Sequence, residues 1–541
     1  MGRCVKRGVI FVTLGQENKH MASPKSFLVP LFERAKNVTD VLILKRARAK
    51  KWQDRTLKKM LFHARDTEFG KLHQFESLLI AEDTTAQFKK TVPITDYEGM
   101  HSWWQREYGG EDNVTWPGST KYFALSSGTT QGASKYIPVT QDQLKSIARA
   151  SRRQLFAIAK TDVPKDFFTK DYLMIGGSTD LSFDGQKYSG DLSGITTLNL
   201  PFWIERFAKP TEEIKREKDW HHKLEIMVSE APKWDVAMVA GGPAWVKMLF
   251  ERIIERYNLK NIHEIWPHLS VYTWGAVSLT PYKDQIDAML GRPIYYFETY
   301  LASEGFIANQ TKLSSAGMGL VFRNKMYFEF VPFNETNFDE AGDILPGAEA
   351  LDIDEVEAGV SYAIVITTCA GAWRYLIGDV VEFTDVDACE IKITGRTKQY
   401  LSLCGEHLSV ENMNRATQAL GKAMGFPIPE FTVRGLKHEA GEMGHRWFVA
   451  YPAGVEKPDA EKAQQLLDEA LVVLNDDYAT ERKHVLKRME LFWLPESDFL
   501  DFMDQRGKIG GQAKFPRVMP EAVYNEWLSF LGSRYQRDTF A

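Results

Sequence analysis

Cysteine is scarce in this chain of 541 residues, which has only Cys4, Cys369, Cys389 and Cys404. None of the four forms a C-x-x-C pair, and none stands beside histidine at the spacing of a zinc site. The sequence therefore gives no sign of a disulfide framework or of a structural zinc ion. We expect reduced thiols and a cytoplasmic location.

Long apolar runs are also missing, because no run approaches the roughly 20 residues that a helix needs to cross a bilayer. The apolar patch at 9–14 is short for the core of a signal peptide, and no clear small-residue cleavage motif follows it. Lys6 stands where myristoylation requires serine or threonine. We expect no membrane partner, and we expect residues 1–22 to be a weakly ordered extension.

A large excess of one charge is absent too. The formal net charge is −5, which is small for this length, and 26% of the residues are charged. Such a chain has no general attraction to nucleic acid or to an anionic membrane. The basic residues within 38–75, a predicted helix, therefore fit a solvated helix face better than a nucleic-acid-binding one. We expect no nucleic-acid partner.

The length of the chain exceeds what one hydrophobic core supports, so we predict at least two domains. Helical patterns at 141–160 and after Gly241-Gly242-Pro243 alternate with apolar runs, which is typical of an α/β fold. Beyond 394–400 the pattern changes, and helices at 410–423 and 460–474 flank a strand at 447–451. That part has the size of a small α+β domain. The other predicted strands are 122–125, 136–140, 236–240, 269–274, 294–297, 326–332 and 362–368.

The most informative segment is the loop between the first two predicted strands, Leu125-Ser-Ser-Gly-Thr-Thr-Gln-Gly-Ala-Ser-Lys135. Its backbone N–H groups, hydroxyls and closing ammonium suit phosphate oxygens, and its glycines allow a close approach of the backbone. The spacing differs from both G-x-x-x-x-G-K-[ST] and G-x-G-x-x-G. The loop predicts a phosphate site, although an ordinary hairpin connection is rich in the same turn formers.

Three more segments follow that loop in a meaningful order: Tyr300-Leu-Ala-Ser-Glu304, Trp373-Arg-Tyr-Leu-Ile-Gly-Asp379 and Gly507-Lys-Ile-Gly-Gly-Gln-Ala-Lys-Phe-Pro-Arg517. Together the four segments resemble the GH3 acyl-acid amido synthetases, within the acyl-adenylate-forming superfamily of firefly luciferase and the acyl-CoA ligases. The resemblance runs from about residue 93 to residue 516. It implies a luciferase-like α/β fold with a large N-terminal domain at 23–394 and a smaller, mobile α+β domain at 395–541.

The resemblance also implies a site for ATP and Mg²⁺. Glu304 would be a catalytic group and a Mg²⁺ ligand, and Asp379 would accept the ribose hydroxyls with its two oxygens. Lys514 would enter with the mobile domain and place its ammonium on the reacting carboxylate and the α-phosphate. Tyr300 would offer a stacking face to adenine. The other expected nucleotide contacts are Ser126, Ser127, Gly128, Thr129, Thr130, Lys135, Gly275, Ala276, Thr299, Ser303 and Arg396, the last in a hinge-like segment.

Each of these residues has a plainer alternative role. Glu304 by itself fits a helix N-terminus, Asp379 a turn after a glycine, and Lys514 a solvated loop. Arg374 could serve in an ion pair beside the site and not in the site itself. Candidates for the acyl pocket are Arg152, Trp203 and Tyr300, although helix packing explains the first two almost as well.

Two positions depart from the family pattern. Ala302 stands where the family often has serine, and Leu376 stands where it favours arginine. Neither change touches Glu304 or Asp379, so adenylation should survive, and the departures bear on substrate preference.

The predicted reaction begins with a carboxylic acid and ATP, which form an acyl-AMP and pyrophosphate. The acyl group then passes to an amine, above all that of an amino acid, and an amide results. Two alternatives remain: an acyl-CoA ligase that uses the same adenylate, and a nucleotide-binding regulatory protein without catalysis. We expect the protein to be a monomer.

Overall fold

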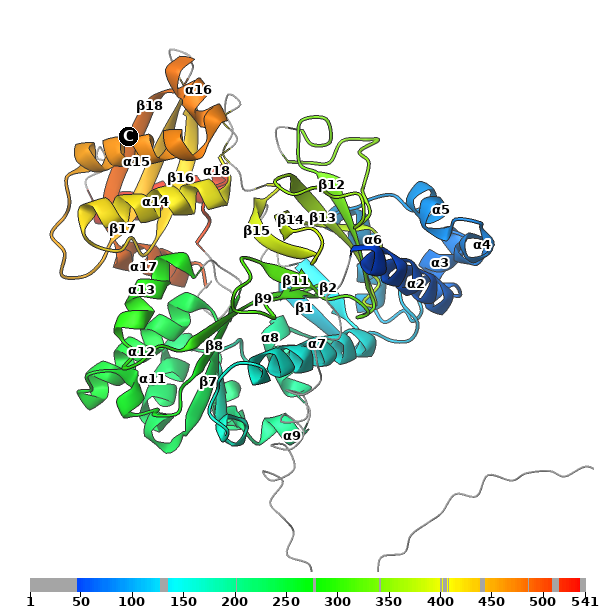
Figure 1. Cartoon of the computed structure of the whole chain (residues 1–541), viewed down its shortest axis with the longest axis horizontal. Helices are drawn as coiled ribbons and strands as arrows, with labels where there is room; N and C mark the ends of the chain where they lie inside the picture. The colour runs from blue at the N-terminus through cyan, green and yellow to red at the C-terminus, as the bar shows by residue number, and fades with distance from the viewer. Residues whose placement is uncertain are drawn as a thin grey trace, which may run out of the picture.

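The structure is a computed structural model, and it describes residues 46–126, 135–200, 202–275, 279–339, 342–398, 401, 406, 408–437, 443–484, 486–507 and 515–535. The predicted extension at 1–22 lies outside these ranges. The expected α/β class is confirmed by the helices and strands, which are interspersed between residues 122 and 302, and by the three sheets that the strands form (Figure 1).

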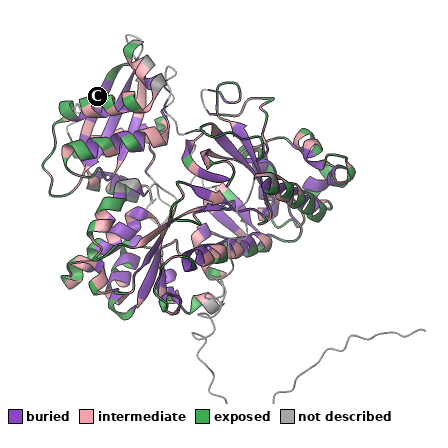
Figure 2. Cartoon of the chain, viewed as in Figure 1, coloured by how far each residue is buried: buried purple, intermediate pink, exposed green. Residues whose placement is uncertain are grey.

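An eleven-stranded sheet forms the centre of the protein, in the order β12-β13-β14-β15-β11-β10-β9-β8-β7-β3-β6. The half from β9 to β6 is parallel, and the half from β12 to β9 is antiparallel. Most strands are buried on both faces, which explains their continuous apolar sequences (Figure 2). The strands are β3 (Asp171–Met174), β6 (Ala208–Lys209), β7 (Val236–Ala240), β8 (Val271–Gly275), β9 (Tyr295–Ala302), β10 (Gly305–Asn309), β11 (Met318–Leu320), β12 (Met326–Pro332), β13 (Ser361–Thr368), β14 (Tyr375–Asp385) and β15 (Glu390–Arg396).

Helices cover both faces of the parallel half. Tyr272 packs into one core with α11 and α12, whereas its neighbour Val271 packs into another with α7. This alternation follows from the two-residue period of a strand. The helices of this part are α7 (Gln141–Ala159), α8 (Leu192–Leu198), α9 (Phe202–Glu205), α10 (Glu212–Lys215), α11 (Trp220–Glu230), α12 (Pro243–Tyr257) and α13 (Thr280–Ala288), with short 3₁₀ turns at Phe167–Thr169, Ala231–Lys233 and Ile262–Glu264.

The N-terminal helices pack on the antiparallel half around the fully buried Trp373, whose indole N–H donates to the carbonyl oxygen of Thr115 at 3.0 Å. The single helix predicted over 38–75 is wrong in one respect. The chain breaks after Ala64, because the Thr67 side chain accepts the Gly70 N–H and starts a new helix. The helices are α2 (Arg46–Ala64), α3 (Glu68–Leu72), α4 (Phe75–Ile80), α5 (Thr84–Thr91) and α6 (Tyr97–Tyr108).

A four-stranded sheet in the order β2-β1-β5-β4 carries the predicted phosphate loop. The loop joins two antiparallel strands, as the sequence indicated. Its strands are β1 (Tyr122–Ser126), β2 (Lys135–Val139), β4 (Ser182–Phe183) and β5 (Tyr188–Gly190).

The C-terminal part has its own three-stranded sheet, β16-β17-β18. Helices α14 and α15 pack on one face, and α17 and α18 on the other, which forms two separate cores. Lys247 of α12 pairs with Glu496 of α17 at 3.7 Å and links this part to the large one. The domain boundary at 394/395 stays a prediction. The elements are α14 (Val410–Met424), β16 (Phe431–Lys437), β17 (Met443–Tyr451), α15 (Ala460–Leu474), α16 (Asp476–His484), β18 (Leu486–Pro495), α17 (Glu496–Gln505) and α18 (Glu521–Arg534).

Candidate functional site

The hairpin between β9 and β10 carries the Glu304 motif. The sequence predicted a strand that ends at Phe297, with a polar turn after it. The predicted end is wrong, because β9 continues to Ala302. Strand β8 pairs with its first half and β10 with its second half, so the whole segment has partners. Glu304 lies in the two-residue turn that follows, not at a helix N-terminus.

Asp379 lies at the centre of a compact polar cluster. The Tyr300 hydroxyl donates to one oxygen of the Asp379 carboxylate, and Arg396 Nε donates to the other at 2.8 Å. The pairing of β14 with β15 sets Asp379 directly opposite Arg396. Asp379 is therefore part of a strand and not a turn residue. The Asp379 charge raises the pKa of Arg396, and each carboxylate oxygen keeps a free lone pair.

Glu304 is a buried carboxylate beside this cluster, with 7% of its surface exposed. Burial raises its pKa to about 7, and the nearby Asp379 charge adds to the effect, while Arg396 and Lys135 oppose it. Burial, and after it the nearby Glu304 charge, raise the pKa of the Tyr375 hydroxyl, so Tyr375 also belongs to the surroundings of Glu304. The structure thus brings Lys135, Tyr300, Glu304, Asp379 and Arg396 into one place, as the motifs predicted.

Lys135 ends the phosphate loop, and its backbone pairs with that of Ser126 at the mouth of the loop. Its ammonium lies 5.0 Å from the centre of the Tyr97 ring, and burial lowers its pKa although Glu304 counteracts this. Sequence reasoning missed Tyr97 and Tyr375 as neighbours of the site. Tyr375 was within reach, because it lies inside the Trp373–Asp379 motif, whereas no local pattern marks Tyr97.

Gly275 and Thr299 lie side by side at the ends of β8 and β9. The strands approach so closely that a Cβ on Gly275 would stand 2.4 Å from the Thr299 carbonyl oxygen. Glycine is therefore required at position 275 for a steric reason. Ser303 is buried in the neighbouring turn, and its carbonyl oxygen accepts a hydrogen bond from Gln143. Ser127, Gly128, Thr129, Thr130, Ala276 and Lys514 lie outside the described residues.

The two acyl-pocket candidates are placed less directly. Arg152 is exposed on α7, nine residues beyond Gln143, which is about 13 Å along the helix axis. Burial lowers the pKa of Arg153, and the charges of Arg149, Arg323 and Arg152 lower it further. Among the described residues, no contact joins Arg152 to Asp379 or Glu304. Trp203 lies in α9, and its side chain is outside what the structure describes.

Both departures from the family pattern have a clear location. Leu376 is buried in an apolar cluster with Ala363 and Val365, so its side chain completes a core. Ala302 pairs with Gly305 across the hairpin that holds Glu304. Arg374 forms an ion pair with Glu329, which confirms the alternative that the sequence left open.

Within the described ranges, no group of three or more His, Cys, Asp or Glu side chains is arranged to hold a metal ion. A magnesium ion does not require such a group, since it commonly uses one or two carboxylates together with phosphate oxygens and water. Glu304 fits that requirement. No helix in the described part of the chain is both long enough and apolar enough to cross a membrane.

The fold has close counterparts among solved structures. A structure titled "AtGH3.15 acyl acid amido synthetase in complex with 2,4-DB" matches with a TM-score of 0.72 at 17% identity and covers 96% of this chain and 97% of that one. A 2-hydroxyisobutyryl-CoA ligase in the postadenylation state matches with a TM-score of 0.58 at 15% identity, covering 90% and 93%. The fold is that of the acyl-adenylate-forming ligases.

The sequence matches then identify the family. The GH3 family N-terminal, central and C-terminal domains match residues 40–293, 319–396 and 411–522. The jasmonoyl–L-amino acid synthetase JAR4 of Nicotiana attenuata is 23% identical over 87% of this chain and 91% of that protein. A probable indole-3-acetic acid-amido synthetase of Oryza sativa is 34% identical, over 24% and 28%. The chain belongs to the GH3 family and is an amide-forming ligase.

The contact between β8 and β9 yields a first prediction. Gly275→Ala should lower the free energy of unfolding by about 1–3 kcal/mol, because the new methyl group overlaps the Thr299 backbone. Gly319→Ala in β11 is the matched control, since its nearest atom is 3.8 Å away. Urea denaturation of both variants measures the difference. Equal stabilities would contradict the close approach of the two strands.

The raised pKa of Glu304 yields a second prediction. Between the ordinary pKa of 4.5 and the folded value of about 7, the unfolded chain loses this proton first, so stability falls as pH rises. Glu304→Gln removes the penalty and should be more stable than the wild type at pH 8 by up to about 3 kcal/mol. Urea denaturation at pH 5 and pH 8 checks this. A stability difference that does not change with pH would show that Glu304 titrates normally.

Proposed function

We propose that this ligase activates a carboxylic acid with ATP. An oxygen of the acid attacks the α-phosphorus, the bond to the β-phosphate breaks, and pyrophosphate leaves. The amine of an amino acid then attacks the acyl carbon of the adenylate, AMP leaves, the nitrogen loses a proton, and an amide forms. The convergence of Lys135 from one sheet with Glu304, Tyr300, Asp379 and Arg396 from the other supports this proposal.

The cluster offers separate groups to the two ends of the nucleotide. Asp379 would accept the ribose hydroxyls with its remaining lone pairs, while Tyr300 and Arg396 hold the carboxylate in place. The hydroxyl-rich loop from Ser126 to Thr130, with Lys135, would bind the phosphates. Adenine would lie along Gly275, Ala276 and Thr299. Ser303 supports the turn beside the phosphates through its backbone.

Glu304 is the residue that would hold Mg²⁺ together with oxygens of the triphosphate. A bound Mg²⁺ neutralises charge that develops on the phosphates as pyrophosphate leaves. Against the effect of burial, the charges of Arg396 and Lys135 lower the pKa of Glu304 and so favour the carboxylate form that such an ion requires. Burial favours the protonated form of Glu304. A bound cation would favour the ionised form instead, so the site suits a cation better than water.

The acid and the amine would meet at the carboxyl ends of β3, β7 and β8, where ligands gather in open α/β sheets. Arg152 and Trp203 remain candidate contacts of the acyl group, Arg152 only if an extended acid reaches along α7. The expected cytoplasmic location and the monomeric state belong to the same proposal.

An exchange assay tests this function. Acid-dependent exchange between ATP and pyrophosphate should appear with a suitable member of a panel of aliphatic and aromatic carboxylic acids. The best acid is then offered with each amino acid and, separately, with coenzyme A. Amide formation is the expected outcome. Thioester formation without amide would support a CoA ligase, and a complete lack of exchange would support a regulatory protein without catalysis.

The Asp379 contact yields a third prediction. Asp379→Asn should weaken ATP binding by a factor of about 10 to 100, because a charge-assisted acceptor is lost, while acid binding changes little. Glu382→Gln is a control on the same strand, since Glu382 pairs with Lys392 at the surface. Calorimetric titration of ATP into both variants is the measurement. If ATP affinity is the same in the two folded variants, Asp379 does not bind ribose.

Lys514 yields a fourth prediction. Its ammonium would offset the repulsion between the acyl carboxylate and the α-phosphate, and this repulsion no longer exists once the adenylate has formed. Lys514→Ala should therefore lose most pyrophosphate exchange but still convert synthetic acyl-AMP and amine into amide. Single-turnover amide formation distinguishes the two steps. An equal loss in both would mean that Lys514 acts in both or is structural.

A further inference from the structure

Arg374 is almost fully buried, and all three nitrogens of its guanidinium make contacts within the protein. Nε and Nη2 donate to the Glu329 carboxylate at 3.0 and 2.8 Å, and Nη1 donates to the carbonyl oxygens of Lys89 and Val92 at 2.6 and 2.8 Å. The backbone of Arg374 adopts φ = 45°, a left-handed conformation that non-glycine residues rarely take. Strain of this kind persists only where the surroundings impose it.

The position of Arg374 connects it to the Glu304 side of the candidate site. The next residue is the buried Tyr375, whose pKa is raised by burial and by the charge of the nearby Glu304. The Arg374 carbonyl oxygen accepts the Thr95 N–H at 3.0 Å, and the Leu376 N–H donates to the Thr95 carbonyl oxygen at 2.7 Å. The start of β14 is thereby fixed against the segment that follows α5.

The same segment leads to the Lys135 side of the site. Two residues after Thr95, the Tyr97 hydroxyl accepts the backbone N–H of Tyr136 at 3.1 Å. The Tyr97 ring also lies under the Lys135 ammonium. Arg374 therefore binds, through the Val92 carbonyl oxygen and its own backbone contact with Thr95, a segment that contacts both Lys135 and the start of β14.

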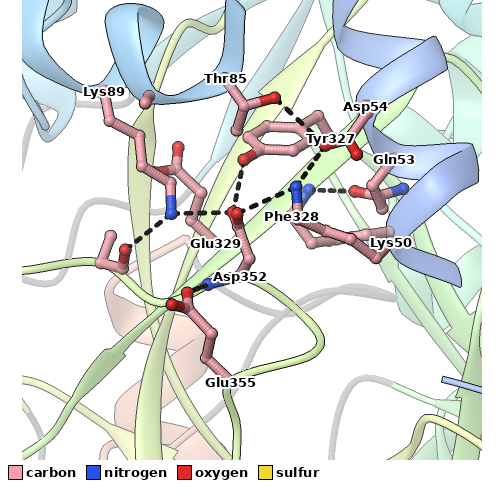
Figure 3. Close-up of polar contacts among 12 residues, drawn as sticks. Lys50, Gln53, Asp54, Thr85, Lys89, Tyr327, Phe328, Glu329, Asp352 and Glu355 are labelled. Atoms are coloured by element: carbon pink, nitrogen blue, oxygen red, sulfur yellow. Dashed lines mark hydrogen bonds and ion pairs between the residues drawn. The ribbon is translucent and has the colours of Figure 1, made fainter. Parts of the chain in front are cut away.

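The Glu329 end of the pair continues into a network of alternating charge (Figure 3). The Lys89 charge opposes the effect of burial, which raises the pKa of Glu329. Lys89 also forms an ion pair with Asp352 at 2.8 Å, and Asp352 forms one with Lys50 at 3.2 Å. Figure 3 shows the Lys89 nitrogen joined to Asp352 by a dashed line, with Glu329 beside them and Lys50 and Asp54 on α2. The outer members of this network do not contact Arg374, which makes them suitable controls.

We propose that Arg374, held by Glu329, is a positioning residue that sets the distance between Lys135 and Glu304 and thereby the fit of the triphosphate. The proposal rests on the proposed function, since it assumes that these two residues receive the phosphate end of ATP. Asp379 has its own supports in Tyr300 and Arg396. Loss of the Arg374–Glu329 pair should therefore weaken the binding of MgATP and leave the binding of AMP nearly unchanged.

The test compares Glu329→Gln, Arg374→Lys and the control Asp352→Asn. Lysine lacks the planar fork that reaches a carboxylate and two carbonyl oxygens at once. We expect Glu329→Gln and Arg374→Lys to raise the Kd of MgATP by about tenfold or more, with the Kd of AMP within about twofold of the wild type. Asp352→Asn should change neither Kd, even if it lowers the melting temperature as much as the other two variants do. Calorimetric titration and thermal denaturation give these values.

Three outcomes would overturn the proposal: an unchanged MgATP affinity, an equal loss for MgATP and AMP, or the same selective loss in Asp352→Asn. If the first two variants do not fold, Tyr97→Phe decides, because it removes only the hydroxyl that accepts the Tyr136 N–H. The same selective loss is then expected, and wild-type affinity for both nucleotides would overturn the proposal. A wild type that binds MgATP but shows no acid-dependent exchange would refute the proposed function instead.

Discussion

Arg374 and Glu329 form an ion pair inside the protein, where Glu329 has no exposed surface at all. A buried charge is costly unless a partner and further hydrogen bonds satisfy it, and here two carbonyl oxygens from the end of α5 complete the guanidinium's contacts. The pair therefore holds three parts of the chain together: the N-terminal helices, β12 and the start of β14. The positions of Tyr375 and of the segment before α6 both follow from this contact.

Around the candidate nucleotide site, charges of opposite sign stand close together before any ligand is bound. Lys135 and Arg396 face Glu304 and Asp379, and burial weakens the screening of each charge by water. The carboxylate of Asp379 is held at both oxygens, by the Tyr300 hydroxyl and by Arg396. An arrangement of this kind is already oriented for charged ligands, so little reorganisation is needed when they bind.

Elements with a strong local pattern could be predicted from the sequence. The strands at 236–240 and 326–332 and the helix at 460–474 have the predicted bounds, because apolar periodicity and flanking turn residues mark them. The extent of β9 could not be predicted in this way. Its residues Glu298 to Ala302 look like a polar turn, and only the pairing with β8 and β10, distant in the sequence or formed by a hairpin, makes them a strand.

The sequence by itself determined the candidate site residues, since the motifs around Lys135, Glu304 and Asp379 stand in a recognisable order. It also determined the family and the α/β class. Only the tertiary structure decided that Tyr97 lies beneath Lys135, that Arg396 faces Asp379 and that Arg374 pairs with Glu329. These contacts join residues that are 17 to 45 positions apart or more, and local propensities do not encode the register and packing that bring such residues together.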